Sequence, residues 1–228
     1  MTDSFILPIN KPPAMSSYDV IRRAKRHVLP SLSPKTKIGH AGTLDVFADG
    51  LLLLLFGSAT KKFDQFQTSA KTYRAVARLG ASTPTLDTEG VVSMQQNTPR
   101  ISREQMLEMI PTFLGSFDQK IPAFSATKSD GKTMYELARK GVELNKTKAV
   151  TVHSIQLVSY MSTLACLEVT VSSGTYIRQL SYDLFRTLGV ESFLTSLTRT
   201  QIGEVTLRQS CELRELESNG WEKYAIVV

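Results

Sequence analysis

The chain has 228 residues, of which 42% are hydrophobic and 21% charged, and its formal net charge is +6. These values are typical of a globular protein, so they exclude wholesale disorder and fibrous architectures. The longest apolar run, Leu51 to Phe56, is too short for a membrane helix, and the chain does not open on a signal-peptide pattern. The two cysteines, Cys166 and Cys211, are too few for a disulfide framework. We therefore expect a cytoplasmic protein with reduced thiols and no membrane attachment.

The positive charge is concentrated near the N-terminus. Residues 1–62 contain nine Lys/Arg and four Asp/Glu, a net charge of +5, whereas the remainder of the chain carries +1. A basic region of this kind is typical of proteins that hold a phosphate backbone. A solvated basic helix face without a partner explains the same charge, and charge alone does not decide between the two interpretations.

The N-terminal segment predicts a strand and a helix. An apolar strand over residues 5–9 ends at a Lys-Pro-Pro sequence. A helix then begins at Ser16 or Ser17 and ends near His27, with its apolar residues at helical spacing and its basic residues on the other face. Residues 30–37, rich in Ser and Pro, predict a loop.

A segment dense in small residues follows and leads into the most apolar part of the chain. Residues 39–45 predict a loop, and the run from Leu51 to Phe56 predicts a buried strand. Gly57 then opens a helix that we expect to place Phe63 and Phe66 inward.

The rest of the chain mixes strands and helices without a strict alternation. Alternating residues predict a strand, apolar runs predict two paired strands, and periodic segments predict four helices. The alternating strand is 71–79, and the paired strands are 149–160 and 163–172. The four helices are 102–110, 133–140, 176–188 and 210–216. This pattern favours an α+β fold over a doubly wound sheet, and the lack of repeats and linker-like stretches predicts a single domain over 1–228.

Most familiar catalytic motifs are missing. The chain has no P-loop, no dinucleotide-binding glycine pattern and no paired Cys-x-x-Cys, and its three histidines lack ligand spacing, so we expect no metal site. Asp45, in a small-residue loop directly before a buried strand, has the setting of a nucleophile or base. An aspartate that caps backbone amides in a turn has the same setting.

A longer pattern around Asp45 resembles the catalytic signature of the bacterial tRNA pseudouridine-55 synthase family. The matched positions are Gly39, His40, Gly42, Leu44, Asp45, Ala48, Gly50, Leu52, Gly57, Ala59, Thr60 and Lys61. Further matches follow in the family's order at 11–17, 71–75, 85–90, 121–139, 173–178 and 197–199. The chain departs from the signature at Val46 and at Asp49, and from the family's N-terminal element at Ala14, and we expect Asp49 to point into solvent.

The resemblance implies an isomerase that converts uridine 55 in the T-arm of tRNA to pseudouridine, without cofactor or metal. Asp45 would be the catalytic carboxylate, attacking C1′ or C6 or assisting elimination at the ribose. Arg178 would pair with Asp45 and keep it ionised, and Tyr73 would stack on the target base and take part in proton transfer.

The resemblance also implies residues that bind the RNA. Tyr176 would hydrogen-bond the base edge, Leu197 would pack against the base, and His40 would fill the gap that the extruded uridine leaves. Four lysines would grip phosphates, namely Lys11, Lys61, Lys128 and Lys132.

The family's fold is a mixed, mostly antiparallel sheet with flanking helices and a central RNA-binding cleft. The resemblance places a tRNA-binding insertion at about 120–150, and we expect a single catalytic domain without the family's usual C-terminal RNA-binding domain. An RNA-binding or tRNA-folding factor with dispensable catalysis is the alternative, and a synthase in a guide-RNA complex is a third. Intact Asp45, Tyr73 and Arg178 favour the enzyme, acting as a monomer.

Overall fold

The computed structural model describes residues 3–125, 127–129, 131–142, 144–218 and 220–227, and at 128, 129 and 135 only the backbone. The chain divides into two compact units, the first comprising Met1–Tyr73 with Leu197–Val228 and the second Arg74–Ser196. It passes from one unit to the other within two strands, β4 (Lys71–Leu79) and β12 (Ser192–Ile202). The single catalytic domain stays a prediction.

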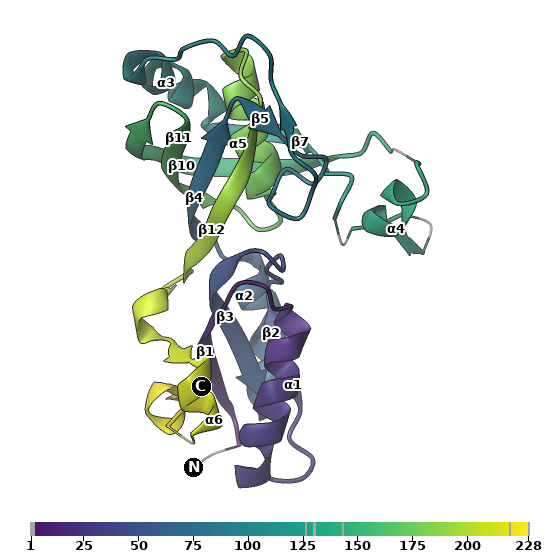
Figure 1. Ribbon diagram of the computed structural model, residues 1–228. Coiled ribbons are helices and arrows are strands. Elements are labelled where there is room, and N and C mark those ends of the chain that lie inside the picture. Colours follow the sequence, from purple (N-terminus) through teal and green to yellow (C-terminus); the bar gives the residue numbers. More distant parts are fainter. Residues whose placement is uncertain (1–2, 126, 130, 143, 219, 228) are drawn as a thin grey trace. The chain divides into compact units, whose positions relative to one another are not determined.

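The first unit is built on two long antiparallel strands, β1 (Phe5–Lys11) and β3 (Asp49–Phe56). On β3, β2 (Ile38–Ala41) pairs antiparallel and β12 pairs parallel. The short strands β13 (Val205–Thr206), β14 (Cys211–Glu212) and β15 (Ile226–Val227) pair with β12 or β1. Its helices are α1 (Ser17–His27), α2 (Phe63–Thr68) and α6 (Leu213–Glu217), with 3-10 turns at Leu29–Ser31, Gly57–Lys62, Leu207–Gln209 and Glu222–Tyr224 (Figure 1).

The continuous apolar run in β3 is explained by burial of both faces of the strand. Leu52, Leu54 and Phe56 pack with alternate residues of β1 and with the apolar stripe of α1. Leu51 and Leu53 face the other way, into a second cluster. A strand buried on both faces needs apolar residues at every position, so the sequence shows a run instead of an alternation.

The predicted start of α1 is confirmed, and Ser16 is its N-cap. The Ser16 hydroxyl accepts from the backbone N–H of Asp19 at 3.1 Å, and the Asp19 carboxylate accepts from the backbone N–H of Ser16 at 3.0 Å. This reciprocal capping box satisfies two backbone donors that the first helical turn leaves without partners. It places Ser17 as the first residue of the helix.

The second unit has a mainly antiparallel sheet in the order β4, β11 (Leu164–Val171), β10 (Thr147–Met161) and β7 (Gly115–Lys120). Its longer helices are α3 (Arg103–Met109), continued by a 3-10 turn at Ile110–Phe113, and α5 (Ile177–Thr187). The strands β5 (Ala81–Ser82) and β6 (Ser93–Met94) form a small separate pair. The α+β prediction with a mostly antiparallel sheet is confirmed.

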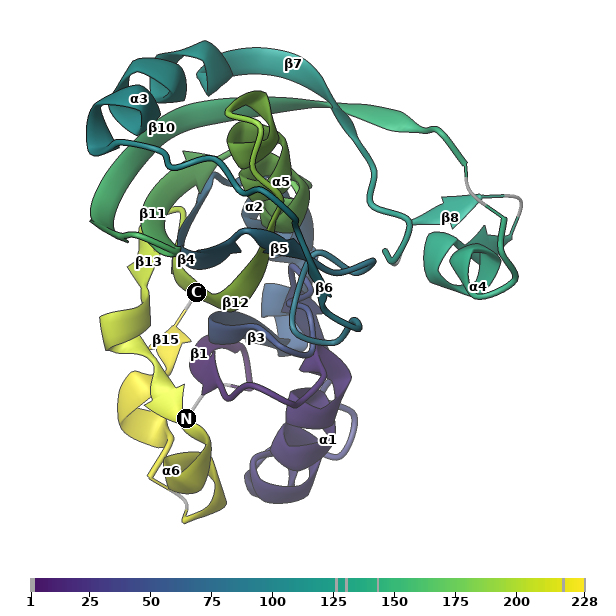
Figure 2. The ribbon, with the colours of Figure 1, turned by 45° about the horizontal axis from the view of Figure 1, so that its top comes forward.

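The stretch between β7 and β10 corresponds to the insertion predicted at about 120–150. It carries β8 (Lys128–Ser129), β9 (Lys132–Thr133) and α4 (Met134–Ala138), and Figure 2 shows β8 and α4 on an arm between β7 and β10. The RNA-binding role of this arm stays a prediction.

Several local predictions were wrong. Residues 39–41 form part of β2 because they pair with β3, and Cys211–Glu212 form β14 before the last helix. The strands β7 and β12 were not predicted, since neither shows a clear two-residue alternation. Phe63 is 41% exposed and does not face the core, whereas Phe66 packs against the second cluster as predicted.

Among the described residues, no helix has both the length and the apolar character that crossing a membrane requires.

Candidate functional site

The loop of residues 42–48, here called the Asp45 loop, connects β2 to β3 in the first unit. Leu44 and Ala48 are buried on either side of Asp45, which stays partly exposed. Two buried neighbours hold the Asp45 backbone at a fixed position, as is required of a group that must meet a substrate in one geometry.

Ser17 is the first of three side chains that anchor the Asp45 loop. The backbone N–H of Leu44 donates to Ser17 Oγ at 3.0 Å, and the same hydroxyl lies 3.4 Å from the Leu44 carbonyl oxygen. Both residues are buried. The peptide before Asp45 is therefore tied to the first turn of α1, and its buried polar groups are satisfied.

Lys11, at the end of β1, is the second anchor and is fully buried. Its ammonium donates to the carbonyl oxygens of Pro12 at 2.9 Å, Met15 at 2.6 Å and Val46 at 3.5 Å. Burial lowers the pKa of Lys11 to about 8, and the carboxylates of Asp49 and Asp45 offset part of that shift.

This environment does not fit the phosphate contact predicted for Lys11. A buried ammonium whose donors point at three backbone carbonyls has no surface to offer to an RNA backbone. Lys11 instead joins the segment after β1 to the residue that follows Asp45.

Arg199, in β12, is the third anchor and is 1% exposed. Its Nη2 donates to the Gly42 carbonyl at 2.8 Å, its Nη1 to the Thr43 carbonyl at 3.4 Å and its Nε to the Leu51 carbonyl at 2.8 Å. One planar guanidinium thus holds the start of the Asp45 loop and the strand that follows it. Sequence reasoning noticed the Leu197–Arg199 match but assigned Arg199 no role.

Glycine is required where β3 passes Arg199. Gly50 has a φ of +101°, and a Cβ at that position would lie 2.4 Å from the Arg199 carbonyl oxygen. Since backbone is the obstacle, no side-chain movement relieves the clash. Gly50 therefore lets β3 and β12 approach closely just behind the Asp45 loop.

The expectation that Asp49 points into solvent is wrong. Asp49 is only partly exposed, and its Oδ1 is buried with no hydrogen-bond partner among the described residues. Its carboxylate interacts with the buried ammonium of Lys11. Asp49 thus supplies negative charge near a buried cation, which explains why a carboxylate is tolerated four residues after Asp45.

Tyr73 and Leu197 are also buried in the first unit, on β4 and β12. Close to them, Lys71 is buried and donates to the carbonyls of Phe66, Gln67 and Ser69, and burial lowers its pKa to about 8. The stacking and packing roles of Tyr73 and Leu197 stay predictions.

His40 lies in β2, two residues before the Asp45 loop, and is partly exposed. Burial, followed by the charge of Arg199, lowers the pKa of His40, so its imidazole is neutral at pH 7. Its Nδ1 is buried and has no hydrogen-bond partner among the described residues.

Arg178 lies in the first turn of α5, in the second unit, and is 4% exposed. Its Nη1 is 3.3 Å from Asp87 Oδ2 and donates to the Thr85 carbonyl at 2.6 Å, while Nη2 donates to the Phe124 carbonyl at 3.0 Å. Asp87 also accepts from the Thr85 hydroxyl at 2.6 Å and from the Glu89 N–H at 2.9 Å. Asp87 and the carbonyls of Thr85 and Phe124 thus hold Arg178 in place, a role that the sequence did not reveal. Its pairing with Asp45 stays a prediction.

Tyr176 is the N-cap residue of α5 and links three segments of the second unit. Its backbone exchanges two hydrogen bonds with the Gln119 side chain, at 2.8 and 3.0 Å, and its hydroxyl lies 2.5 Å from Thr127 Oγ1. These contacts connect α5 to β7 and to the arm between β7 and β10.

The remaining predicted phosphate-binding lysines lie in both units. Lys61 is exposed in the 3-10 turn before α2, and Lys132 is exposed in β9. Lys128 lies in β8, and its side chain is outside the described residues. Among the residues that the structure describes, no group of three or more His, Cys, Asp or Glu is placed to hold a metal ion.

Comparison with known proteins identifies the family. Residues 30–177 match the family described as "TruB family pseudouridylate synthase (N terminal domain)". A curated protein of Parabacteroides distasonis called tRNA pseudouridine synthase B is 39% identical over 214 residues, which cover 93% of this chain and 91% of that protein. The protein of the same name from Dechloromonas aromatica is 40% identical over 214 residues, 93% of this chain and 70% of that protein.

A solved structure titled "Crystal Structure of a Cbf5-Nop10-Gar1 Complex" contains a chain of the same fold. The TM-score is 0.73 at 22% identity, covering 97% of this chain and 58% of that one, so this chain spans less than two thirds of the solved one. At that identity the likeness concerns the fold alone. The sequence relatives go further, because they match nearly the whole chain at about two fifths identity. The chain therefore belongs to the TruB family of pseudouridylate synthases.

Proposed function

We propose that this chain isomerises uridine 55 in the T-arm of tRNA to pseudouridine, with Asp45 as the catalytic carboxylate. The relatives named tRNA pseudouridine synthase B support an isomerase, an intramolecular transferase, that acts on tRNA. The observation that carries the role of Asp45 is the anchoring of its loop by Ser17, Lys11 and Arg199. A turn aspartate that merely caps amides does not need three buried anchors.

The reaction breaks the C1′–N1 bond, turns the base and forms a C1′–C5 bond, while C5 loses its proton and N1 gains one. No net oxidation occurs, and the base stays bound throughout. Asp45 attacks C1′ or C6, or assists elimination at the ribose, and its contribution is a carboxylate held against the reacting carbon. Lys11 lies close enough to interact with that carboxylate.

Arg178 completes the site by pairing with Asp45 and keeping it ionised. Its side chain is preorganised for this task because Asp87 and two carbonyls already fix the guanidinium. Tyr73 stacks on the base and takes part in proton transfer at C5, Tyr176 hydrogen-bonds the base edge, and Leu197 packs against it.

Reaching Asp45 requires the uridine to leave the folded T-loop, at an unstacking cost that the pocket returns. His40 fills the gap in the RNA stack, and a neutral imidazole suits that role because it carries no charge into the stack. Lys61, Lys128 and Lys132 hold phosphates and set affinity more than base choice.

We further propose that the protein acts as a monomer in the cytoplasm. Cys166 and Cys211 are both free thiols, which fits a reducing compartment.

The test is tritium release from tRNA that carries 5-tritiated uridine, because forming the C5 bond expels that hydrogen. The wild type should release about one equivalent per tRNA, and Asp45→Asn should release none while binding RNA within a few-fold of wild type. Asp64→Asn is the matched control, the same substitution at an exposed position of α2, and should keep turnover. Strong turnover by Asp45→Asn would refute its role. Tight binding without release by the wild type would indicate an RNA-binding protein instead.

A further inference from the structure

Lys71, the first residue of β4, is a buried cation that has no part in the steps described so far. It is 4% exposed, and its Nζ donates to the carbonyl oxygens of Phe66 at 3.1 Å, Gln67 at 2.9 Å and Ser69 at 2.7 Å. An ammonium group has three donors, so these three carbonyls use its full capacity. Burying a cation is costly unless its donors are satisfied, and here backbone oxygens satisfy them.

These carbonyls lie at the end of α2. The last four carbonyls of a helix have no partner within the helix, and Phe66 and Gln67 belong to that group. The Ser69 hydroxyl takes another of them, donating to the Gln65 carbonyl at 2.7 Å. Lys71 therefore completes the end of α2 and fixes the turn through which the chain enters β4.

The same side chain lies against the start of the Asp45 loop. A Cβ placed on Gly42 would be 3.5 Å from Lys71 Cε and 3.3 Å from Arg199 Nη1. Arg199 also donates to the Gly42 carbonyl at 2.8 Å. The first residue of the loop is thus held between two buried cations. Their proximity explains why the charge of Arg199 adds to burial in lowering the pKa of Lys71 to about 8.

The strand β4 carries the position of Lys71 forward to Tyr73. The two residues alternate with less buried ones, so their side chains share the buried face of the strand. They are roughly 7 Å apart along the backbone. Between them, the Thr72 carbonyl accepts from the Thr200 hydroxyl of β12 at 3.2 Å. A displacement of Lys71 therefore moves Tyr73 as well.

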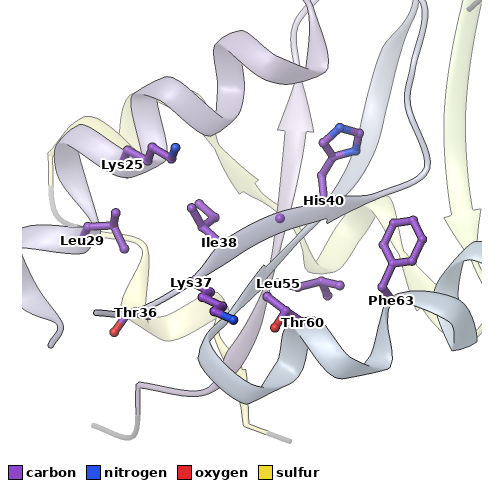
Figure 3. Close-up of a pocket in the computed structure, with 10 residues that line it drawn as sticks. Lys25, Leu29, Thr36, Lys37, Ile38, His40, Leu55, Thr60 and Phe63 are labelled. Carbon is purple, nitrogen blue, oxygen red and sulfur yellow. The ribbon is translucent and has the colours of Figure 1, made fainter. Parts of the chain in front are cut away.

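The other end of α2 lies beside the strand that leads into the Asp45 loop. Phe63, the first residue of α2, and His40 of β2 line one pocket beside β2, as Figure 3 shows. The helix thus borders β2 where it begins and receives the Lys71 ammonium where it ends. A single short helix is in contact with both segments that lead to the proposed catalytic groups.

We propose that Lys71 is a positioning residue for the isomerisation, holding Tyr73 and the Asp45 loop at a fixed separation through the end of α2 and Gly42. Lys71 itself touches neither the base nor the ribose. Its effect is on how two side chains meet one nucleotide, where a misplacement of about 1 Å can lower the rate about a hundredfold. This inference rests on the proposed function, because the roles of Tyr73 and Asp45 come from there.

The experiment compares Lys71→Met with Leu216→Ala. Lys71→Met removes the ammonium and keeps an unbranched stem of similar length. Leu216 is buried in α6 of the first unit and has no contact with the Asp45 loop, so Leu216→Ala lowers the stability of the same unit without touching the site. Both proteins are assayed at a temperature at which circular dichroism shows them folded.

Single-turnover tritium release over a range of enzyme concentrations separates the maximal rate from the half-saturating concentration. We expect Lys71→Met to lower the maximal rate about tenfold or more, with the half-saturating concentration within about twofold of the wild type. Leu216→Ala should leave both within about twofold. A maximal rate of Lys71→Met equal to that of Leu216→Ala would overturn the proposal, as would a loss confined to the half-saturating concentration.

A second variant covers the case in which Lys71→Met does not fold. Lys71→Gln keeps two donors for the carbonyls but shortens the stem that lies against Gly42. Its maximal rate should also fall below that of Leu216→Ala, and equal rates would overturn the proposal.

A double-mutant cycle tests whether Lys71 acts through Tyr73. Lys71→Met should slow Tyr73→Phe by a smaller factor than it slows the wild type, because the hydroxyl that it displaces is already absent. Equal factors would contradict this route. Tritium release by the wild type separates the two hypotheses. Absent release refutes the proposed function, whereas normal release with an unaffected Lys71→Met refutes the positioning role alone.

Discussion

Replacing Arg199 by lysine tests whether the guanidinium fork holds the Asp45 loop. Arg199→Lys keeps the positive charge but replaces the three separate nitrogens that reach the carbonyls of Gly42, Thr43 and Leu51 by a single ammonium nitrogen. At least two hydrogen bonds from a charged donor are lost, each worth roughly 1.5–3 kcal/mol. We expect a loss of about 3–5 kcal/mol in the free energy of unfolding.

The assay is urea denaturation of the wild type, Arg199→Lys and Arg208→Lys. Arg208 is exposed and serves as the matched control, for which we expect a change of less than about 0.5 kcal/mol. Turnover by Arg199→Lys should fall more than about tenfold, because a small displacement of the loop moves the Asp45 carboxylate away from the reacting carbon. An Arg199→Lys protein as stable and as active as Arg208→Lys would refute the anchoring argument.

Two further predictions concern buried charges, and a third concerns the exposed Lys132. Asp87→Asn removes the carboxylate charge that lies 3.3 Å from the buried guanidinium of Arg178 and should cost about 3 kcal/mol in thermal unfolding; an unchanged midpoint would contradict the buried pair. Burial lowers the pKa of Lys11 and Lys71 from 10.5 to about 8, so the unfolded chain binds more protons between these values and stability should rise from pH 8 toward pH 10.5. Lys11→Met should flatten that rise in urea titrations, and an unaltered slope would show that Lys11 does not cause it. Lys132→Ala should weaken binding equally for modifiable and unmodifiable RNA and lower the slope of log binding constant against log salt concentration by about one. A loss confined to one RNA sequence would contradict the phosphate contact of Lys132.

Features of this protein that depend on near neighbours in the sequence could be predicted from the sequence. The alternation in β4 places Tyr73, Ala75 and Leu79 on the buried face, as predicted, and the capping residues mark the start of α1. Both features depend on neighbours within a few residues, where backbone geometry and side-chain period act directly. The loop with Asp45 was recognisable for a different reason, because its pattern of small residues resembles a family signature.

The interactions that hold the Asp45 loop and Arg178 could not be predicted from the sequence, because they join residues far apart in the chain. Arg199 and Gly42 are separated by 157 positions, and Arg178 and Thr85 by 93. Nothing near Lys11 indicates that its ammonium is buried under carbonyls instead of facing RNA.

The pocket beside β2 depends on tertiary structure in the same way. Phe63 has the spacing of a core residue, and only the packing of α2 against β2 leaves its ring exposed. By itself, then, the sequence determined the α+β class, the caps, the alternating strand and the Asp45 signature, which are properties of short segments. The tertiary structure decided which cations are buried, what they hold and where the pocket beside β2 opens, since burial and hydrogen bonding are settled only when distant segments meet.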